Sequence, residues 1–170
     1  GWKLAPNICY ETVIPHFIRR HVNQLRRLGR EPDVLVNLTN DGWFRGSSEL
    51  EQHLACSVFR AVECRKPMLI AANTGISAWI DGDGRIVAEG PKRDTAVLLA
   101  QPRRDPRRSW YLDHGDLLAG ACLAFSALAA VVGLGQRWAE WRRARRNAIA
   151  AAAGKASSRE QAPPPQTRPR

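Results

Sequence analysis

The hydrophobic and polar positions of the first seventy residues follow the periods of strands and helices in turn. Apolar runs at 2–9, 34–38 and 68–72 predict short buried strands. Between them, apolar side chains three and four residues apart predict amphipathic helices over 15–28 and 49–66. A chain in which strands and helices alternate in this way is typical of the α/β class.

The next thirty residues are predicted to be strands without intervening helices. Asp81-Gly82-Asp83-Gly84 is a strong hairpin turn, and it separates apolar runs at 76–80 and 85–88. A further strand is expected at 95–100. Since alternating helices come first and consecutive strands follow, we predict an α/β fold with a mixed sheet.

A run of 19 residues without a charge follows at 117–135. As a helix it would be about 28 Å long, close to the thickness of a membrane's hydrocarbon core. Trp138 and Trp141 lie just beyond it among five arginines, as in the interfacial belt of a membrane protein. We therefore predict a transmembrane helix at 113–136. The alternative is a buried helix of a soluble core.

The positive charge of the chain lies mostly after this helix. Residues 137–170 carry nine Lys or Arg and two Asp or Glu, whereas residues 1–136 carry only three more basic than acidic side chains. A basic segment behind an apolar helix is typical of the cytoplasmic flank of a membrane span, so no nucleic acid partner is expected. We expect 137–170 to form a disordered cytoplasmic tail.

The cysteines indicate nucleophilic chemistry and no metal site. None of the four forms a CxxC pair, so neither a metal nor another cofactor is expected. Cys9 ends an apolar run and precedes a turn, which is how a strand presents a nucleophile. The N–H of Tyr10 would then be placed to hold an oxyanion, and Glu11 to organise the turn. The alternative is that Cys9 is a packed core residue.

Four ordered blocks and the final apolar helix resemble the carbon–nitrogen hydrolase (nitrilase) superfamily, and within it the membrane-bound apolipoprotein N-acyltransferases. The resemblance covers about residues 3–136. Its blocks are Ala5-Pro6-Asn7-Ile8-Cys9-Tyr10-Glu11, Leu38-Thr39-Asn40-Asp41-Gly42-Trp43-Phe44, Gln52-His53 with Arg60 and Glu63, and Asn73-Thr74-Gly75-Ile76-Ser77.

The resemblance implies a four-layer αββα sandwich on the periplasmic side of the bacterial cytoplasmic (inner) membrane, in a multi-pass parent protein. It implies that a phospholipid donates a fatty acyl chain, which passes through a cysteine thioester to the N-terminal amine of a diacylglyceryl-Cys apolipoprotein. Residues 1–112 would be the C-terminal part of such a catalytic domain.

The resemblance also implies roles for single residues. Cys9 falls on the nucleophile, and Tyr10 and Glu11 fall on neighbours that the family needs for catalysis. Trp43 and Phe44 fall in a loop beside the substrate pocket. We expect five further residues to support the scaffold: Asn40, Asp41, Arg60, Glu63 and Asn73.

The sequence departs from the family in two of the three residues of the catalytic triad. The family triad contains a Glu and a Lys well upstream of the Cys, and no residue of this sequence matches either. We therefore expect the chain to be an incomplete, inactive part of a longer enzyme. Two other functions stay open: a nitrilase-type amidohydrolase, which would not need the apolar helix, and a membrane-anchored remnant without catalysis.

Overall fold

The computed structural model describes residues 1–160 except Gly46 and Arg93, with side chains described up to residue 147. The chain divides into two compact units, Gly1–Leu117 and Leu118–Arg170. In chain order the first unit contains β1 (Leu4–Ile8), the 3-10 helix η1 (Cys9–Val13), α1 (Pro15–Arg27), β2 (Val34–Asn40), the 3-10 helix η2 (Asp41–Phe44), α2 (Glu49–Cys64), β3 (Met68–Asn73), β4 (Ala78–Ile80), β5 (Ile86–Glu89) and α3 (Trp110–His114).

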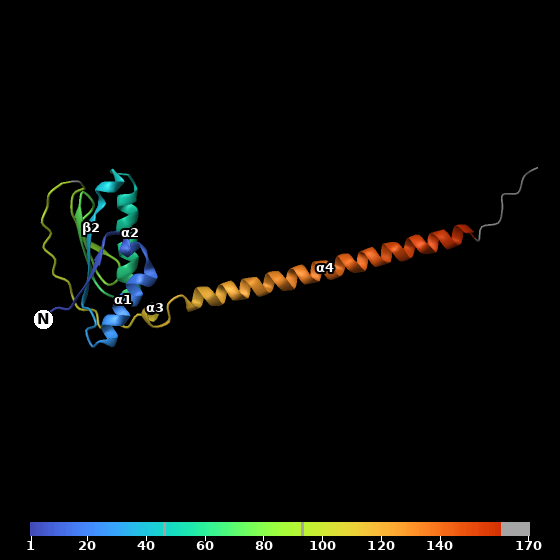
Figure 1. Ribbon diagram of the computed structural model, residues 1–170, viewed down its shortest axis with the longest axis horizontal. Coiled ribbons are helices and arrows are strands. Elements are labelled where there is room, and N and C mark those ends of the chain that lie inside the picture. Colours follow the sequence, from blue (N-terminus) through green and yellow to red (C-terminus); the bar gives the residue numbers. More distant parts are fainter. Residues whose placement is uncertain (46, 93, 161–170) are drawn as a thin grey trace, which may run out of the picture. The chain divides into compact units, whose positions relative to one another are not determined.

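The first unit is built on one mixed sheet with the strand order β1-β2-β3-β4-β5. β1, β2 and β3 are parallel, while β4 and β5 add antiparallel strands. Parallel neighbours need crossover helices, which α1 and α2 provide on one side of the sheet (Figure 1). The predicted α/β class with a mixed sheet is confirmed.

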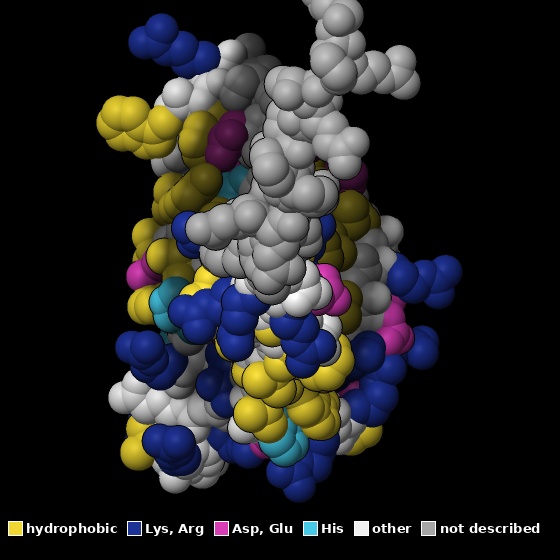
Figure 2. Space-filling view, turned by 90° about the vertical axis from the view of Figure 1, so that its right-hand side faces the viewer, with side chains coloured by type: hydrophobic (Ala, Val, Ile, Leu, Met, Phe, Trp, Pro, Cys, Tyr) yellow, Lys and Arg dark blue, Asp and Glu magenta, His cyan; other side chains and the backbone are white. Residues whose placement is uncertain are grey.

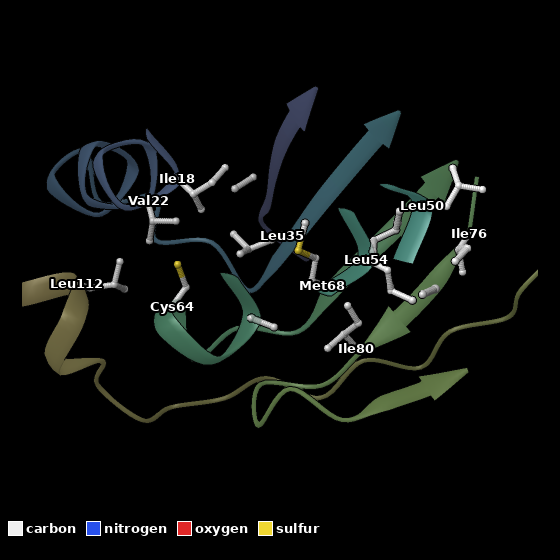
Figure 3. Packing of buried hydrophobic residues seen from close by; sticks show 14 residues of the cluster. Ile18, Val22, Leu35, Leu50, Leu54, Cys64, Met68, Ile76, Ile80 and Leu112 are labelled. Carbon is white, nitrogen blue, oxygen red and sulfur yellow. The ribbon is translucent and has the colours of Figure 1, made fainter. Parts of the chain in front are cut away.

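The hydrophobic core lies between this sheet and its helices. α1 contributes Ile18 and Val22, and α2 contributes Leu54, each from an apolar stripe at helical spacing. Figure 3 shows these side chains pointing toward Leu35 of β2 and Met68 of β3. Burial of this apolar stripe fixes α1 and α2 against the strands and so positions the strand ends.

The carboxyl ends of the three parallel strands meet at one edge of the sheet. Asn40 at the end of β2 is in register with Asn73 at the end of β3, and Ile8 at the end of β1 is in register with Leu38. Side chains at such an edge converge, and ligands of open α/β sheets bind there. Cys9 follows directly after Ile8, so the fold places it at this edge.

The sheet face away from α1 and α2 is apolar and open. Leu4 and Ile8 on β1 and Leu38 on β2 are each about half exposed, and they alternate with buried residues such as Ala5 and Asn37. The described residues therefore form a sheet covered by helices on one face.

One strand prediction was wrong. Residues 95–100 form no strand, and Val97 and Leu99 are more than four-fifths exposed. The apolar alternation of this segment is typical of a strand, but the segment pairs with none of the five strands of the sheet.

The second unit is dominated by α4, which runs from Leu117 to Glu160. Residues 117–147 form the one helix of the described chain that is long and apolar enough to cross a membrane, with a mean hydropathy of 2.3 in its most apolar window. None of that window is buried within the structure. Residues 113–116 belong to the end of α3 and to a turn at Gly115.

The segment predicted to be a disordered tail overlaps α4. Residues 137–160 continue α4, and the remaining ten residues lie outside the described part of the chain. Alanine and arginine, which dominate 142–153, are among the strongest helix formers, and this outweighs the inability of the segment to build a core. On the face that Figure 2 shows, Lys and Arg side chains in dark blue lie beside hydrophobic side chains in yellow.

Candidate active site

The turn after β1 holds Cys9 in an unusual backbone conformation. Its φ is 50°, in the left-handed region that residues with a side chain enter only at a cost. The carboxylate of Glu11 fixes the entry to this turn, because Glu11 Oε2 accepts the Ile8 N–H at 2.6 Å. Such a conformation persists only where the surrounding structure determines it, and it is frequent at functional sites.

An open groove of about 690 Å³ runs along the strand ends beside this turn. Cys9 lines it together with Trp43, Asn40 and Asn73, so the fold brings four of the predicted residues to one place. Ile8 and Leu38 make part of the wall apolar, and Trp43 is 80% exposed. The groove therefore joins a thiol to a surface that can take an apolar ligand.

Tyr10 and Phe44 lie on the α2 side of the turn and are absent from the groove lining. Their rings are 6.1 Å apart, and both lie close to the ring of His53. The Tyr10 hydroxyl donates to Glu49 Oε1 at 3.0 Å, and this acceptor raises the pKa of Tyr10. The two aromatic rings thus pack over the side of the turn that faces the helix.

A buried polar network lies beneath Cys9. His53 Nδ1 lies 3.1 Å from Asp41 Oδ1, which also accepts the Thr39 hydroxyl at 2.7 Å. His53 Nε2 lies 2.8 Å from Thr12 Oγ1 and 3.2 Å from the Cys9 carbonyl oxygen. The network therefore links the carboxylate at the end of β2 to the backbone of the Cys9 turn.

The predicted scaffold residues lie on both sides of this network. Asn73 Nδ2 donates to Asn40 Oδ1 at 3.4 Å, which ties the ends of β3 and β2 together. Asp41 is buried against Gly75, where a Cβ would lie 2.1 Å from Asp41 Oδ2. Only glycine allows this approach of the 73–77 loop to the carboxylate.

Arg60 joins α2 to the Cys9 turn. Its Nη1 donates to the Thr12 carbonyl at 3.1 Å, and its Nη2 forms an ion pair with Glu63 Oε1 at 2.7 Å. The Arg60 side chain is 5% exposed and that of Glu63 is 25% exposed. Burial raises the pKa of Glu63, and the Arg60 charge opposes that rise.

His53 belongs to one of the four motifs, but the motif itself indicates no role for it. The sequence motifs also do not single out Thr12, Thr39 or Asn37. One signal was available in α2, where His53, Ser57 and Arg60 follow each other at helical spacing among apolar residues. Polar side chains on the buried stripe of a helix need partners, and here those partners lie on the Cys9 turn and beside β2.

Known proteins with similar sequences were found for most of this chain. The carbon-nitrogen hydrolase family matches residues 1–111. Apolipoprotein N-acyltransferase of Rhodopirellula baltica is 42% identical over 154 residues, which are 88% of this chain and 26% of that protein. The protein of the same name from Geobacter metallireducens is 42% identical over 125 residues, 74% of this chain and 23% of its own length.

The chain thus spans about a quarter of the length of these relatives. Among solved structures, a carbon-nitrogen hydrolase superfamily protein of Xanthomonas campestris aligns with 56% of this chain and 38% of its own, at a TM-score of 0.45 and 20% identity. Because the family match covers well over half of the 170 residues, the chain belongs to the carbon-nitrogen hydrolase family.

Proposed function

We propose that this chain carries the nucleophile of an apolipoprotein N-acyltransferase. The observation that carries the proposal is Cys9, which is held in a left-handed turn at the strand ends and lines an open, partly apolar groove. The two relatives described above bear this enzyme's name, and an apolar helix follows the domain as a membrane enzyme requires.

The reaction takes two steps on the sulfur of Cys9. In the first, the thiolate attacks the ester carbonyl of a phospholipid, a thioester bond forms, and the lysophospholipid oxygen leaves with a proton. In the second, the N-terminal amine of a diacylglyceryl-Cys apolipoprotein attacks the thioester. An amide bond forms, and the sulfur leaves and recovers the proton that the amine gives up.

A base must take the thiol proton, and the contacts of Glu11 leave it unsuited to that task. Its carboxylate is committed to the Ile8 N–H. Three lysines also have partners: Lys3 with the Gly29 carbonyl, Lys66 with Glu31 and Lys92 with Glu51. We therefore propose that the family's Glu and Lys are supplied by a part of the parent protein outside these 170 residues, and that this chain alone is inactive.

The thioester is the direct test of the proposal. The product of the complete reading frame, reconstituted with phospholipid, is expected to carry a fatty acyl group on the peptide that contains Cys9. Hydroxylamine should remove that group, and mass spectrometry should locate it. Normal lipoprotein acylation with Cys9 unmodified throughout would contradict the thioester step. Release of free fatty acid without transfer to an amine would instead support the hydrolase alternative.

We further propose that the part of α4 up to residue 136 spans the inner membrane, with the Cys9 domain on the periplasmic side and the basic segment after it in the cytoplasm. Arg142 lies 3.6 Å from the centre of the Trp138 ring, and Arg145 lies 5.4 Å from that of Trp141. Tryptophan and arginine side by side suit the boundary between lipid and water.

Extraction separates a spanning helix from a peripheral contact. The expressed chain should stay in the membrane pellet after alkaline carbonate treatment, and should be released by detergent. A Leu123→Arg/Leu128→Arg double variant should move into the carbonate supernatant, because charges at the middle of a span are costly. Release of the unchanged chain by carbonate would refute the anchor.

A further inference from the structure

The backbone carbonyl of Cys9 collects more hydrogen-bonding groups than a turn carbonyl ordinarily does. Asn37 Nδ2 donates to it at 3.0 Å, Thr12 Oγ1 donates at 3.3 Å, and His53 Nε2 lies 3.2 Å away. Asn37, Thr12 and His53 are each at most 4% exposed. The orientation of this peptide group is therefore set by buried side chains from β2, η1 and α2.

The donors and acceptors around His53 favour a proton on Nε2. If Nε2 carried a lone pair, it would face the lone pairs of the Cys9 oxygen, and the single Thr12 hydroxyl proton could satisfy only one of the two. If Nε2 carries the proton, it donates toward the Cys9 oxygen and Thr12 Oγ1, and the Thr12 hydroxyl is free to donate to Cys9. On the other side of the ring, Nδ1 lies 3.1 Å from Asp41 Oδ1.

Other charged groups around the imidazole do not compete with Asp41. Tyr10 presents its ring, 5.7 Å from that of His53, while its hydroxyl points to Glu49. Arg60 reaches the network only through the Thr12 carbonyl, with its other contact on Glu63. Among the described residues, Asp41 is the carboxylate hydrogen-bonded to the ring, and Phe44 closes the remaining side.

We infer that His53 is a positioning residue. Paired with Asp41, it donates a hydrogen bond from Nε2 to the Cys9 carbonyl, and this bond holds Cys9 in its left-handed conformation beside the groove. The inference rests on the proposed function only in taking Cys9 as the reacting group. Loss of the donor would let the peptide relax toward the ordinary region of φ, because the left-handed conformation is unfavourable for a cysteine.

Two substitutions separate this role from simple space filling. The amide nitrogen of a glutamine can reach the place of the imidazole Nε2, whereas that of an asparagine reaches only the place of Nδ1. In the whole 170-residue chain in detergent, alkylation of Cys9 by iodoacetamide is expected to slow about fivefold in His53→Asn, the loss of one hydrogen bond. His53→Gln should keep at least half of the original rate.

The readout must be specific to Cys9 and to folded protein. Peptide mass spectrometry distinguishes Cys9 from Cys56, Cys64 and Cys122, and near-ultraviolet circular dichroism compares the folds. His21→Asn, a change on α1 away from the network, serves as the control and should label at the original rate. Equal slowing in His53→Asn and His53→Gln with an intact fold would overturn the inference.

A second measurement needs no variant. Nitrogen-15 NMR of the histidine side chains should show Nε2 of His53 protonated, and a resonance with an unprotonated Nε2 would also overturn the inference. If these results hold but the complete gene product forms no acyl thioester, the proposed function fails and the role of His53 stands. If the complete gene product forms the acyl thioester but these results fail, the proposed function stands and the role of His53 fails.

Discussion

A Cys9→Ser variant of the complete gene product is expected to lose acyl transfer by a factor on the order of a thousand or more. The hydroxyl keeps the size of the side chain, but it is far less nucleophilic and much less acidic than a thiol. The fold should be unaffected, because Cys9 is not part of the hydrophobic core. Transfer of a labelled acyl chain to a synthetic diacylglyceryl-Cys peptide measures the loss.

Cys56→Ser is the matched control for this experiment. Cys56 is a half-buried free thiol on α2, and it does not line the groove. Its replacement should leave transfer within about twofold of the original, since a substitution outside the groove removes no contact made in the transition state. Equal losses in the two variants would show that Cys9 has no special place in the reaction.

Arg60→Met is expected to reduce the free energy of unfolding by about 3 kcal/mol at neutral pH. The Arg60 charge is almost fully buried, and its removal leaves the Glu63 carboxylate and the Thr12 carbonyl without their donor. The Tyr111 hydroxyl is buried without a partner in the described structure, so it donates no replacement bond where it now stands. Urea denaturation followed by circular dichroism measures the change.

The loss in Arg60→Met should depend on pH in a defined direction. Burial already raises the pKa of Glu63, and without Arg60 that pKa rises further. A carboxyl with a raised pKa favours the folded state while it is protonated, and this contribution is lost as pH rises through its folded pKa. The difference between variant and original should therefore be smaller at about pH 4 than at pH 7.

Arg65→Met provides the comparison at the end of the same helix. Arg65 forms an ion pair with Asp83, and both side chains are more than a third exposed, at 35% and 52%. Exposed pairs contribute about 0–1 kcal/mol, so this variant should be nearly as stable as the original and show little pH dependence. A loss as large as that of Arg60→Met would mean that burial of the Arg60–Glu63 pair is not what matters.

The sequence was most informative where one local pattern decides a structure. Apolar periodicity predicted both ends of β1, α1, β2, α2 and β3 to within two residues, because each element buries one stripe or face. Pattern failed at 95–100, since a strand also has to pair with a neighbour and this segment pairs with none of the five strands. At 137–160 the composition argues against a hydrophobic core. The alanine and arginine residues of the segment nevertheless favour a helix, and α4 continues through it.

The candidate site divides in the same way. An apolar run ending in a thiol marks Cys9, and that information is contiguous in the sequence. The network around its carbonyl is assembled from Thr12, Asn37, Asp41 and His53, whose proximity depends on how the strands pair. Roles for Tyr10, Trp43 and Asn73 stay predictions, since position beside a groove does not establish what a side chain does there.

The carbonyl contacts of Cys9 also bear on how the protein folds. Its partners Asn37 and His53 are 28 and 44 residues away in the sequence, and both belong to elements that follow the first crossover. Contacts of such separation form late, because the chain must close long loops before they stabilise anything. During synthesis Cys9 is thus an ordinary flexible cysteine, and it gains its strained geometry only when α2 docks. The left-handed geometry of this one residue is therefore expected to mark the completion of folding.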